Sequence, residues 1–256
     1  MRKTNFIKNY GWIPDRPDQR DIRYATVYKI PARLPSSADL RKFCPAVEDQ
    51  STLGSCTAHA LTGALEVLEK KDGLAVTQMS RLFLYYNERV IENSVDQDNG
   101  AMLRDGIKTL VKQGCCNEAK WPYLIKKFAA KPLAACYKDG LDHQIISYQR
   151  IDTLSQMRAC LAQSFPFVFG FTVYESFGTQ AVAKTGKAPM PKKNERVLGG
   201  HAVLAIGYDD KTKRFLVRNS WGKAWGIKGY FTLPYDYAVS RDLSDDFWTI
   251  RRGEQM

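Results

Sequence analysis

Apolar side chains over residues 55–71 recur at the spacing of one helix face, which predicts a long helix there. These apolar residues are Ala58, Leu61, Ala64, Leu65 and Leu68. A second stripe of the same helix is polar and consists of Cys56, His59, Thr62, Glu66 and Glu69. Ser55 can cap the first turn, and Gly73 suits the position just beyond the last turn. Similar patterns predict helices over about 80–92 and 101–113.

The second half of the chain is richer in aromatic and β-branched side chains, broken by Gly, Asp and Lys turns. The strand candidates are 165–174, 202–208, 215–217 and 230–233. We therefore expect an α+β fold with a mainly helical lobe over 31–145 and a mainly β lobe over 146–256. A cleft between two such lobes is a favoured place for a ligand.

Residues 1–30 are polar and contain two prolines, so we expect an extended arm. Tyr10, Trp12 and Ile13 make the arm partly apolar, and burying one large side chain stabilises a protein by about 1.5–3 kcal/mol. The arm should therefore dock on the surface. Our hypothesis is that it lies near the cleft and limits access to it. The alternative is a structural brace on the back of a lobe.

The composition is that of a soluble enzyme. The chain has 256 residues, with 44% apolar and 25% charged residues. No apolar run approaches the ~18 residues that cross a membrane, and the basic start is not followed by the apolar stretch of a signal peptide. Secreted and cytoplasmic locations both stay open. The net charge of +11 comes from scattered Lys and Arg without a nucleic-acid motif, so we expect no nucleic-acid partner. We also expect a monomer.

Six cysteines are too few to build a disulfide scaffold of this length. Cys136 and Cys160 lie in helix-like apolar stretches and are expected to be small buried hydrophobes. Cys44 and the adjacent Cys115 and Cys116 are the better disulfide candidates.

Cys56 stands at the start of the predicted long helix, after the loop 49–54. The unpaired N–H groups and the dipole at a helix start favour an anion, and the thiolate is the nucleophilic form of cysteine. A cysteine in this position is more often structural than catalytic, so a base must be identified before the position carries weight.

The chain has three histidines. His201 follows two glycines, Gly199 and Gly200, at the start of an apolar strand, and their missing side chains leave room for a substrate. His143 lies in a polar stretch and is expected at the surface. His59 is one helical turn after the cysteine, where a helix-packing role is the favoured interpretation.

A histidine base needs a partner that orients its second ring nitrogen. Asn219 is the candidate, since it ends a predicted strand and is followed by Trp221 and Trp225 with two glycines. An indole laid over a His–Asn hydrogen bond would exclude water and strengthen that bond.

Together these segments resemble the papain–cathepsin family of cysteine peptidases. The matching segments are Gln50 with Gly54-Ser55-Cys56, His201-Ala202-Val203, and Asn219-Ser220-Trp221-Gly222 with Trp225-Gly226. They occur in the family's order, and the distance from cysteine to histidine falls within the roughly 130–150 residues typical of it. The resemblance covers about 34–233 and implies a papain-like two-lobe fold with a barrel-like β lobe.

The resemblance implies a thiol endopeptidase that hydrolyses peptide bonds through a thioester, without metal or cofactor. Cys56 would be the nucleophile, His201 its acid–base partner and Asn219 the group that orients the histidine. Gln50 and the backbone N–H of the cysteine would form the oxyanion hole, and Trp221 would shield the His–Asn bond.

The resemblance also implies a substrate-binding strip. Asn99, Gly100 and Ala101 resemble the family's Asn-Gly-Gly, with Met102 and Leu103 as walls of the pocket for the second residue before the cut. Three positions depart from the family, since Ala101 replaces a glycine, Thr57 replaces a tryptophan and Leu53 replaces a half-cystine. These departures indicate a divergent, microbial member.

Three other functions remain open on the sequence. The same Cys-His-Asn residues could transfer an acyl group to an amine or cleave an isopeptide. A non-catalytic binding protein on this fold would be expected to lose the cysteine or the histidine, and an anion-binding module would act through the basic charge.

Overall fold

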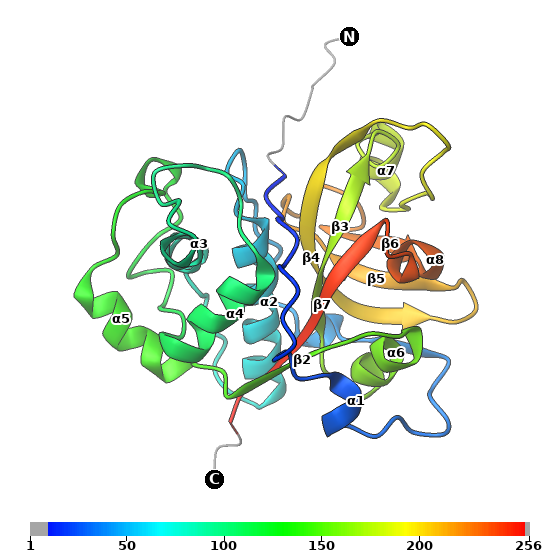
Figure 1. The fold of residues 1–256 in the computed structure, drawn as a ribbon, viewed down its shortest axis with the longest axis horizontal. Coiled ribbons are helices and arrows are strands. Elements are labelled where there is room, and N and C mark those ends of the chain that lie inside the picture. Colours follow the sequence, from blue (N-terminus) through cyan, green and yellow to red (C-terminus); the bar gives the residue numbers. More distant parts are fainter. Residues whose placement is uncertain (1–9, 254–256) are drawn as a thin grey trace.

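The computed structural model describes residues 10–253. Four helices gather on one side of the molecule and a twisted sheet lies on the other (Figure 1). The four helices are α2 (Cys56–Lys71), α3 (Arg81–Ile91), α4 (Leu103–Lys112) and α5 (Ala134–Gly140). The predicted α+β architecture is confirmed, with the helical half first in the chain.

The sheet has seven strands in the order β2-β7-β3-β4-β5-β6, and β1 pairs separately with β4. All of these pairings are antiparallel. The strands are β1 (Ser37–Asp39), β2 (Ser147–Arg150), β3 (Phe167–Tyr174), β4 (Val197–Asp209), β5 (Arg214–Arg218), β6 (Tyr230–Pro234) and β7 (Ser244–Arg251).

Short helices complete the described chain. They are α1 (Tyr24–Val27), α6 (Leu154–Ala162), α7 (Gln180–Thr185) and α8 (Tyr235–Val239), with 3-10 turns η1 (Arg41–Phe43), η2 (Ile125–Lys127) and η3 (Leu141–His143). The predicted helices and strands are all present, but β1, β2 and β7 were not predicted. β1 pairs with β4 of the sheet although it lies within the segment expected to be helical.

Helix α2 is buried on every side, because α3 and α4 pack on one flank and β4 on the other. The polar stripe of α2 is therefore buried as well as its apolar stripe. Ser55 does not cap α2 through its side chain. Its hydroxyl instead lies 2.6 Å from the Tyr123 hydroxyl. Gly73 follows the helix with φ +78°, as predicted for the position beyond its end.

All six cysteines are free thiols. The expectation that Cys44, Cys115 and Cys116 are disulfide candidates is therefore wrong. Cys115 and Cys116 are fully buried in the core of the helical lobe, where they act as small apolar side chains, as Cys136 and Cys160 do. Among residues 10–253, no helix is long and apolar enough to span a membrane.

A buried ion pair joins α2 to α3. Glu66 and Arg81 are at most 2% exposed, and their closest charged atoms are 2.6 Å apart. Removing one partner leaves a buried charge without compensation, so Arg81→Leu should lower the free energy of unfolding by about 3–5 kcal/mol. Denaturant unfolding followed by circular dichroism measures this change.

Two further variants control this prediction. Glu66→Leu combined with Arg81→Leu should recover much of the loss, since no charge stays buried. Arg196→Ala breaks the exposed pair with Glu175 and should change stability by less than about 1 kcal/mol. An Arg81→Leu protein as stable as the native chain would contradict the role of this pair.

Candidate active site

Cys56 is the first residue of α2 and is completely buried. The backbone N–H of Ala202 in β4 donates a hydrogen bond to the Cys56 sulfur at 3.4 Å. Ala202 lies 146 positions after Cys56 in the sequence, and His201 precedes it in β4. The fold therefore brings the first turn of α2 close to the strand that carries the histidine.

The imidazole of His201 is held by Asn219. His201 Nε2 and Asn219 Oδ1 are 2.8 Å apart, and Oδ1 also accepts the Ser220 N–H at 2.9 Å. Because Oδ1 accepts the Ser220 N–H, it is an oxygen, and Nε2 must carry the proton of their hydrogen bond. In the neutral ring, Nδ1 is then the nitrogen that can accept a proton. The Trp221 indole stacks on the imidazole of His201, with ring centres 4.9 Å apart.

The side chain of Gln50 is buried and held at both ends. Its Oε1 accepts the Ser220 hydroxyl at 2.6 Å, and its Nε2 donates to the Leu53 carbonyl at 2.9 Å. The Gln50 N–H also donates to the Ser220 carbonyl at 2.9 Å. Ser220 therefore ties the loop before Cys56 to the segment that carries Asn219.

The other two histidines have different partners. His59 Nδ1 lies 2.9 Å from the Ser55 carbonyl of its own helix, and burial lowers the pKa of His59 to about 3. It is therefore a neutral packing residue, as expected. His143 is not simply a surface residue, because its ring lies 2.7 Å from the buried Glu69.

The described part of the arm runs between the helices and the sheet (Figure 1). The Gly11 carbonyl accepts the Ala101 N–H at 2.8 Å, and the Ile13 N–H donates to the Ala101 carbonyl at 3.0 Å. On the other side, the Trp12 N–H donates to the Gly200 carbonyl at 2.9 Å. The arm thus pairs with Ala101 and Gly200, two of the residues expected to bind substrate. Residues 1–9 of the arm lie outside the described residues.

The arm fits this position closely. A Cβ atom on Gly11 would lie 1.8 Å from the Gly54 carbonyl oxygen, and one on Gly100 would lie 2.0 Å from the Gly11 oxygen. Tyr10 packs against His201 and Trp221, with ring centres 6.2 Å apart in each case. The arm therefore covers the cysteine and the histidine.

This cover affects the electrostatics of the thiol. Burial raises the pKa of Cys56 to about 11, although the N–H groups of Ala202 and Gly11 pull it down. With the arm in place, the thiol is therefore protonated at neutral pH. Removing the arm would return water to the thiol, leaving the helix start to stabilise the thiolate.

The other expected binding residues lie in different environments. Asn99 is exposed, and its side chain donates to Gln97 at 2.7 Å. Met102 is half-buried and lines a hollow of about 620 Å³ between the arm and the start of α4. Leu103 is buried in the core of the helical lobe.

Three acidic residues near the site gave no signal in the sequence. Glu88 in α3 is fully buried and accepts the Thr57 hydroxyl at 2.8 Å, and burial raises the pKa of Glu88 well above its usual range. Asp15 of the arm and Asp246 of β7 meet although 231 residues separate them. Only the fold brings these pairs together, so residue spacing could not have revealed them.

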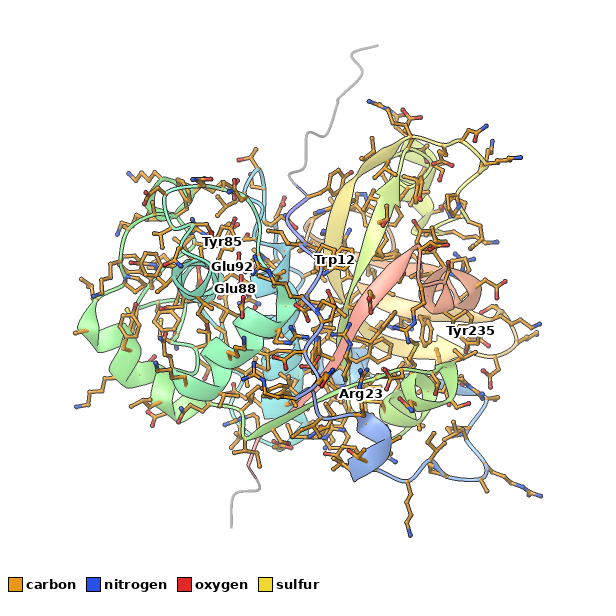
Figure 2. The ribbon with its side chains drawn as sticks, in the orientation of Figure 1. Trp12, Arg23, Tyr85, Glu88, Glu92 and Tyr235 are labelled. Atoms are coloured by element: carbon orange, nitrogen blue, oxygen red, sulfur yellow. The ribbon has the colours of Figure 1, made fainter. Side chains whose placement is uncertain are left out.

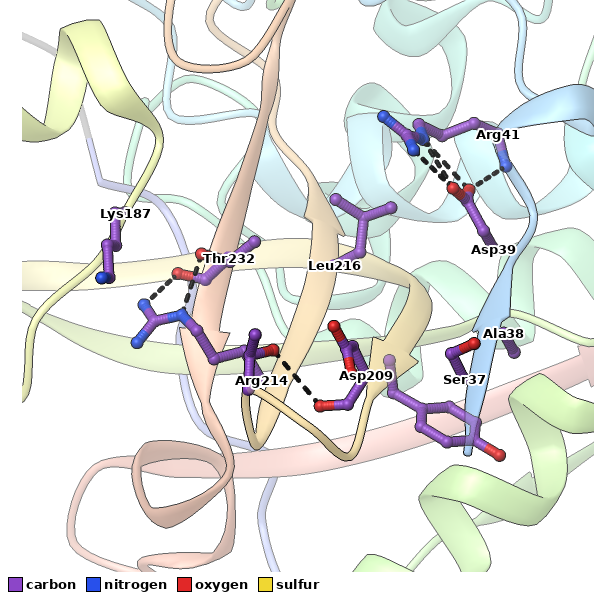
Figure 3. A pocket seen from close by; sticks show the side chains of 11 residues that line it. Ser37, Ala38, Asp39, Arg41, Lys187, Asp209, Arg214, Leu216 and Thr232 are labelled. Atoms are coloured by element: carbon purple, nitrogen blue, oxygen red, sulfur yellow. Dashed lines mark hydrogen bonds and ion pairs between the residues drawn. The ribbon is translucent and has the colours of Figure 1, made fainter. Parts of the chain in front are cut away.

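A separate hollow of about 730 Å³ lies on the sheet where β1 meets β4, away from the cysteine (Figure 3). Arg41 is paired with Asp39, and Arg214 donates to Thr232 at 2.9 Å. The guanidinium group of each arginine therefore already has a hydrogen-bond partner within the hollow. Among residues 10–253, no group of three or more His, Cys, Asp or Glu side chains could hold a metal ion.

Comparison with known proteins agrees with this geometry. The sequence profile of the papain family of cysteine proteases matches residues 34–245. The chain is 40% identical to an uncharacterized peptidase C1-like protein of Acanthamoeba polyphaga mimivirus, over 98% of this chain and 89% of that protein. The crystal structure of xylellain, a cysteine protease from Xylella fastidiosa, superposes with a TM-score of 0.88 at 41% identity and covers 99% of both chains.

The chain therefore belongs to the papain family of cysteine proteases and is a divergent member with microbial and viral relatives. Pro-cathepsin H of Mus musculus is 28% identical over 78% of this chain, which spans 60% of that relative's length. The predicted papain-like fold and cysteine peptidase activity are both confirmed.

The expectation that Cys56 pairs with His201 rather than with His59 can be tested directly. His59→Phe should keep peptidase activity within about tenfold, because an aromatic ring of similar volume can fill the site beside Tyr123. Steady-state kinetics on a peptide substrate measures the effect. A folded His59→Phe protein without activity would mean that the assignment of the base is wrong.

Proposed function

We propose that Cys56, His201, Asn219 and Gln50 are the catalytic residues of a peptidase that works through a thioester. The observation that carries the proposal is the hydrogen bond from His201 Nε2 to Asn219 Oδ1, formed beside a cysteine at a helix start. It commits one ring nitrogen to an orienting role and directs the other toward acid–base chemistry.

The reaction follows from these positions. His201 Nδ1 takes the thiol proton, and the Cys56 thiolate attacks the carbonyl carbon of the peptide bond. The backbone N–H of Cys56 and the Gln50 amide donate to the oxyanion. His201 then gives its proton to the leaving amine, and a thioester remains. A water molecule, deprotonated by His201, attacks the thioester and releases the acid and the thiol.

The same geometry fixes the direction of the substrate. The leaving amine must lie beside His201, so the part of the substrate before the cut extends toward Ala101. The arm runs the opposite way, because Tyr10 lies by His201 whereas the later residue Trp12 pairs with Ala101. A peptide bond in this reversed orientation does not present its amine to the histidine.

We infer that the arm holds the enzyme in a closed state without being cut. Its backbone pairs with Ala101 and Gly200, and its Gly11 covers Cys56. Opening the cleft is then a condition for activity on any substrate. A brace on the back of a lobe would not explain contacts with these residues.

Acyl transfer to an amine would use the same catalytic residues. Product analysis with an added amine distinguishes transfer from hydrolysis, and hydrolysis is the outcome we propose. A monomeric state and the lack of a nucleic-acid partner also remain predictions, which size-exclusion chromatography and a salt-dependent binding assay test.

The catalytic roles predict a graded series. Cys56→Ala and His201→Ala should each abolish nearly all turnover, since nucleophile and base act as a unit. Gln50→Ala should lower kcat by roughly 10²-fold, the scale for losing one oxyanion donor. Asn219→Ala should be milder than the first two, because it affects only the orientation of the imidazole. Steady-state kinetics with a melting curve for each variant measures the series.

Near-normal turnover in a His201→Ala protein would refute the assignment of the base. Equal losses for Asn219→Ala and Cys56→Ala would contradict the orienting role of the asparagine.

The closed state predicts that Gly11→Val activates the 256-residue chain. Any side chain at Gly11 collides with the backbone of Gly54, so the arm should leave the cleft. The kcat/KM for a small peptide should rise by roughly tenfold or more, since the apparent affinity for substrate scales with the fraction of enzyme whose cleft is open. Labelling of Cys56 by an epoxide inhibitor should accelerate in parallel.

Arg20→Ala serves as the matched control, because Arg20 lies in the arm but its side chain bonds only to the neighbouring Asp18 among the described contacts. It should leave both rates unchanged. Unchanged kinetics in Gly11→Val, together with a large fall in melting temperature, would mean that the arm is a brace.

A further inference from the structure

The hydroxyl group of Tyr123 lies between the two segments that carry the proposed oxyanion donors. It is 3.0 Å from the Gln50 carbonyl oxygen and 2.6 Å from the Ser55 hydroxyl. Ser55 directly precedes Cys56, whose backbone N–H is the other proposed donor. Gln50 and Ser55 are completely buried, whereas Tyr123 is half-buried and comes from a third segment of the chain. One side chain thus bridges the two sides of the oxyanion hole.

The directions of these hydrogen bonds follow from the groups involved. A carbonyl oxygen only accepts, so the Tyr123 hydroxyl donates its proton to Gln50. The Ser55 hydroxyl then donates to the Tyr123 oxygen. The two bonds form a chain from Ser55 through Tyr123 to Gln50, and the bonds in such a chain strengthen one another.

The peptide group between Ser55 and Cys56 is held by a second side chain. The Ser55 carbonyl accepts the backbone N–H of His59 at 3.1 Å and lies 2.9 Å from His59 Nδ1. Nδ1 of the neutral ring therefore carries the proton and donates it to this carbonyl. Because a peptide group is planar, fixing its C=O also fixes the direction of the Cys56 N–H. The His59 ring also packs edge-on against Tyr123, with ring centres 5.1 Å apart.

The loop 49–54 needs support beside this helix start. Ser51 has φ +54°, a left-handed conformation that persists where the surrounding structure holds it in place. The Gln50 carbonyl accepts the Leu53 N–H at 3.2 Å as well as the Tyr123 hydroxyl. These two bonds engage both lone pairs of the oxygen and set the orientation of the peptide group at which the loop turns.

The segment that carries Tyr123 is anchored away from the proposed catalytic residues. The Tyr123 N–H donates to the Glu118 carboxylate at 2.5 Å. Two residues earlier, the Trp121 carbonyl accepts the buried Ser80 hydroxyl at 2.6 Å. The Tyr123 hydroxyl is therefore a fixed point against which both oxyanion donors are placed.

We propose that Tyr123 is a positioning residue of the oxyanion hole. Its hydroxyl holds the loop 49–54 against the start of α2, so that the Gln50 amide and the Cys56 N–H converge on one oxygen. Donors that are placed in advance stabilise an oxyanion without reorganisation during the reaction. This inference rests on the proposed peptidase function and gives Tyr123 no contact with the substrate.

Tyr123→Phe removes the hydroxyl and keeps the ring. In the 256-residue chain, kcat for a peptide substrate should fall by roughly tenfold, the upper range for one hydrogen bond. KM should change little, because the oxyanion forms only in the transition state. The loss should be smaller than the roughly 10²-fold expected for Gln50→Ala, since the amide is displaced and not removed. Steady-state kinetics with a melting curve measures the effect.

Alkylation of Cys56 by iodoacetamide separates positioning from a general effect on the fold. The sulfur displaces iodide from a saturated carbon, and no oxyanion forms. The alkylation rate constant of Tyr123→Phe should therefore stay within about twofold of the native value, since it depends on the thiolate alone. The arm, with Trp12 between the helices and the sheet (Figure 2), must leave before either reaction. The ratio of kcat/KM to the alkylation rate constant thus cancels the opening step.

Tyr137→Phe is the matched control. Tyr137 lies in α5, and its hydroxyl donates to Asn87 of α3 at 3.1 Å. Its ring packs against Phe83 of the same helix. This variant also removes one tyrosine hydroxyl from the helical lobe, but it should leave both kcat and the alkylation rate constant unchanged.

A double variant tests whether Tyr123 acts through Gln50. In a Gln50→Ala chain, the further change Tyr123→Phe should lower kcat by less than about threefold, because the donor that the hydroxyl positions is already absent. A full tenfold loss in that background would mean that the two residues act independently, which would overturn the inference.

An unchanged kcat in Tyr123→Phe would also overturn the positioning role. So would an alkylation rate constant that falls as much as kcat/KM, because the hydroxyl would then act on the fold or on the arm. A different result counts against the proposed peptidase function itself, namely that Cys56 is alkylated but neither the native chain nor Gly11→Val turns over any peptide.

Discussion

The contact between the first turn of α2 and strand β4 determines the rest of the site. It places the sulfur of Cys56 against the backbone of Ala202, one residue after His201. Because α2 is buried on all sides, the helix cannot shift without disrupting both lobes. Ser220 then connects the loop of Gln50 to Asn219, so two distant parts of the chain, 50–56 and 201–220, are joined at one site.

The same junction creates the place where the arm lies. Two backbone strips, at Ala101 and Gly200, offer hydrogen bonds to any extended chain that passes over the cysteine, and the arm uses both. In the proposed mechanism, the arm binds in the reversed direction and therefore occupies the cleft without being cleaved. Its close fit over Gly54 excludes water from Cys56, which raises the pKa of the thiol. The close fit of the arm is thus the one physical cause of both effects: it blocks access to Cys56 and it disfavours the thiolate.

The sequence was most informative where chemistry depends on local pattern. The helix that begins at Cys56 follows from its apolar spacing, and three motifs in order pointed to His201 and Asn219. β7 and its residue Asp246 were not predicted, because a bulged strand with a left-handed residue does not follow a regular alternation. The expectation of disulfides was wrong, because the sequence does not distinguish a buried thiol from a cysteine in a disulfide bond. The position of the arm depended on contacts with Gly54 and Gly100 that no spacing reveals.

The claim that the arm silences the nucleophile is tested most directly by the ionisation of Cys56. Site-specific alkylation of Cys56, followed by mass spectrometry across pH, reports its thiolate in the native chain and in Gly11→Val. The account predicts that the native thiol reacts only at strongly alkaline pH, consistent with a pKa of about 11. In Gly11→Val the midpoint should move to neutral pH or below, as expected for a solvated thiolate at a helix start beside a histidine. Identical profiles for the two proteins would contradict the account.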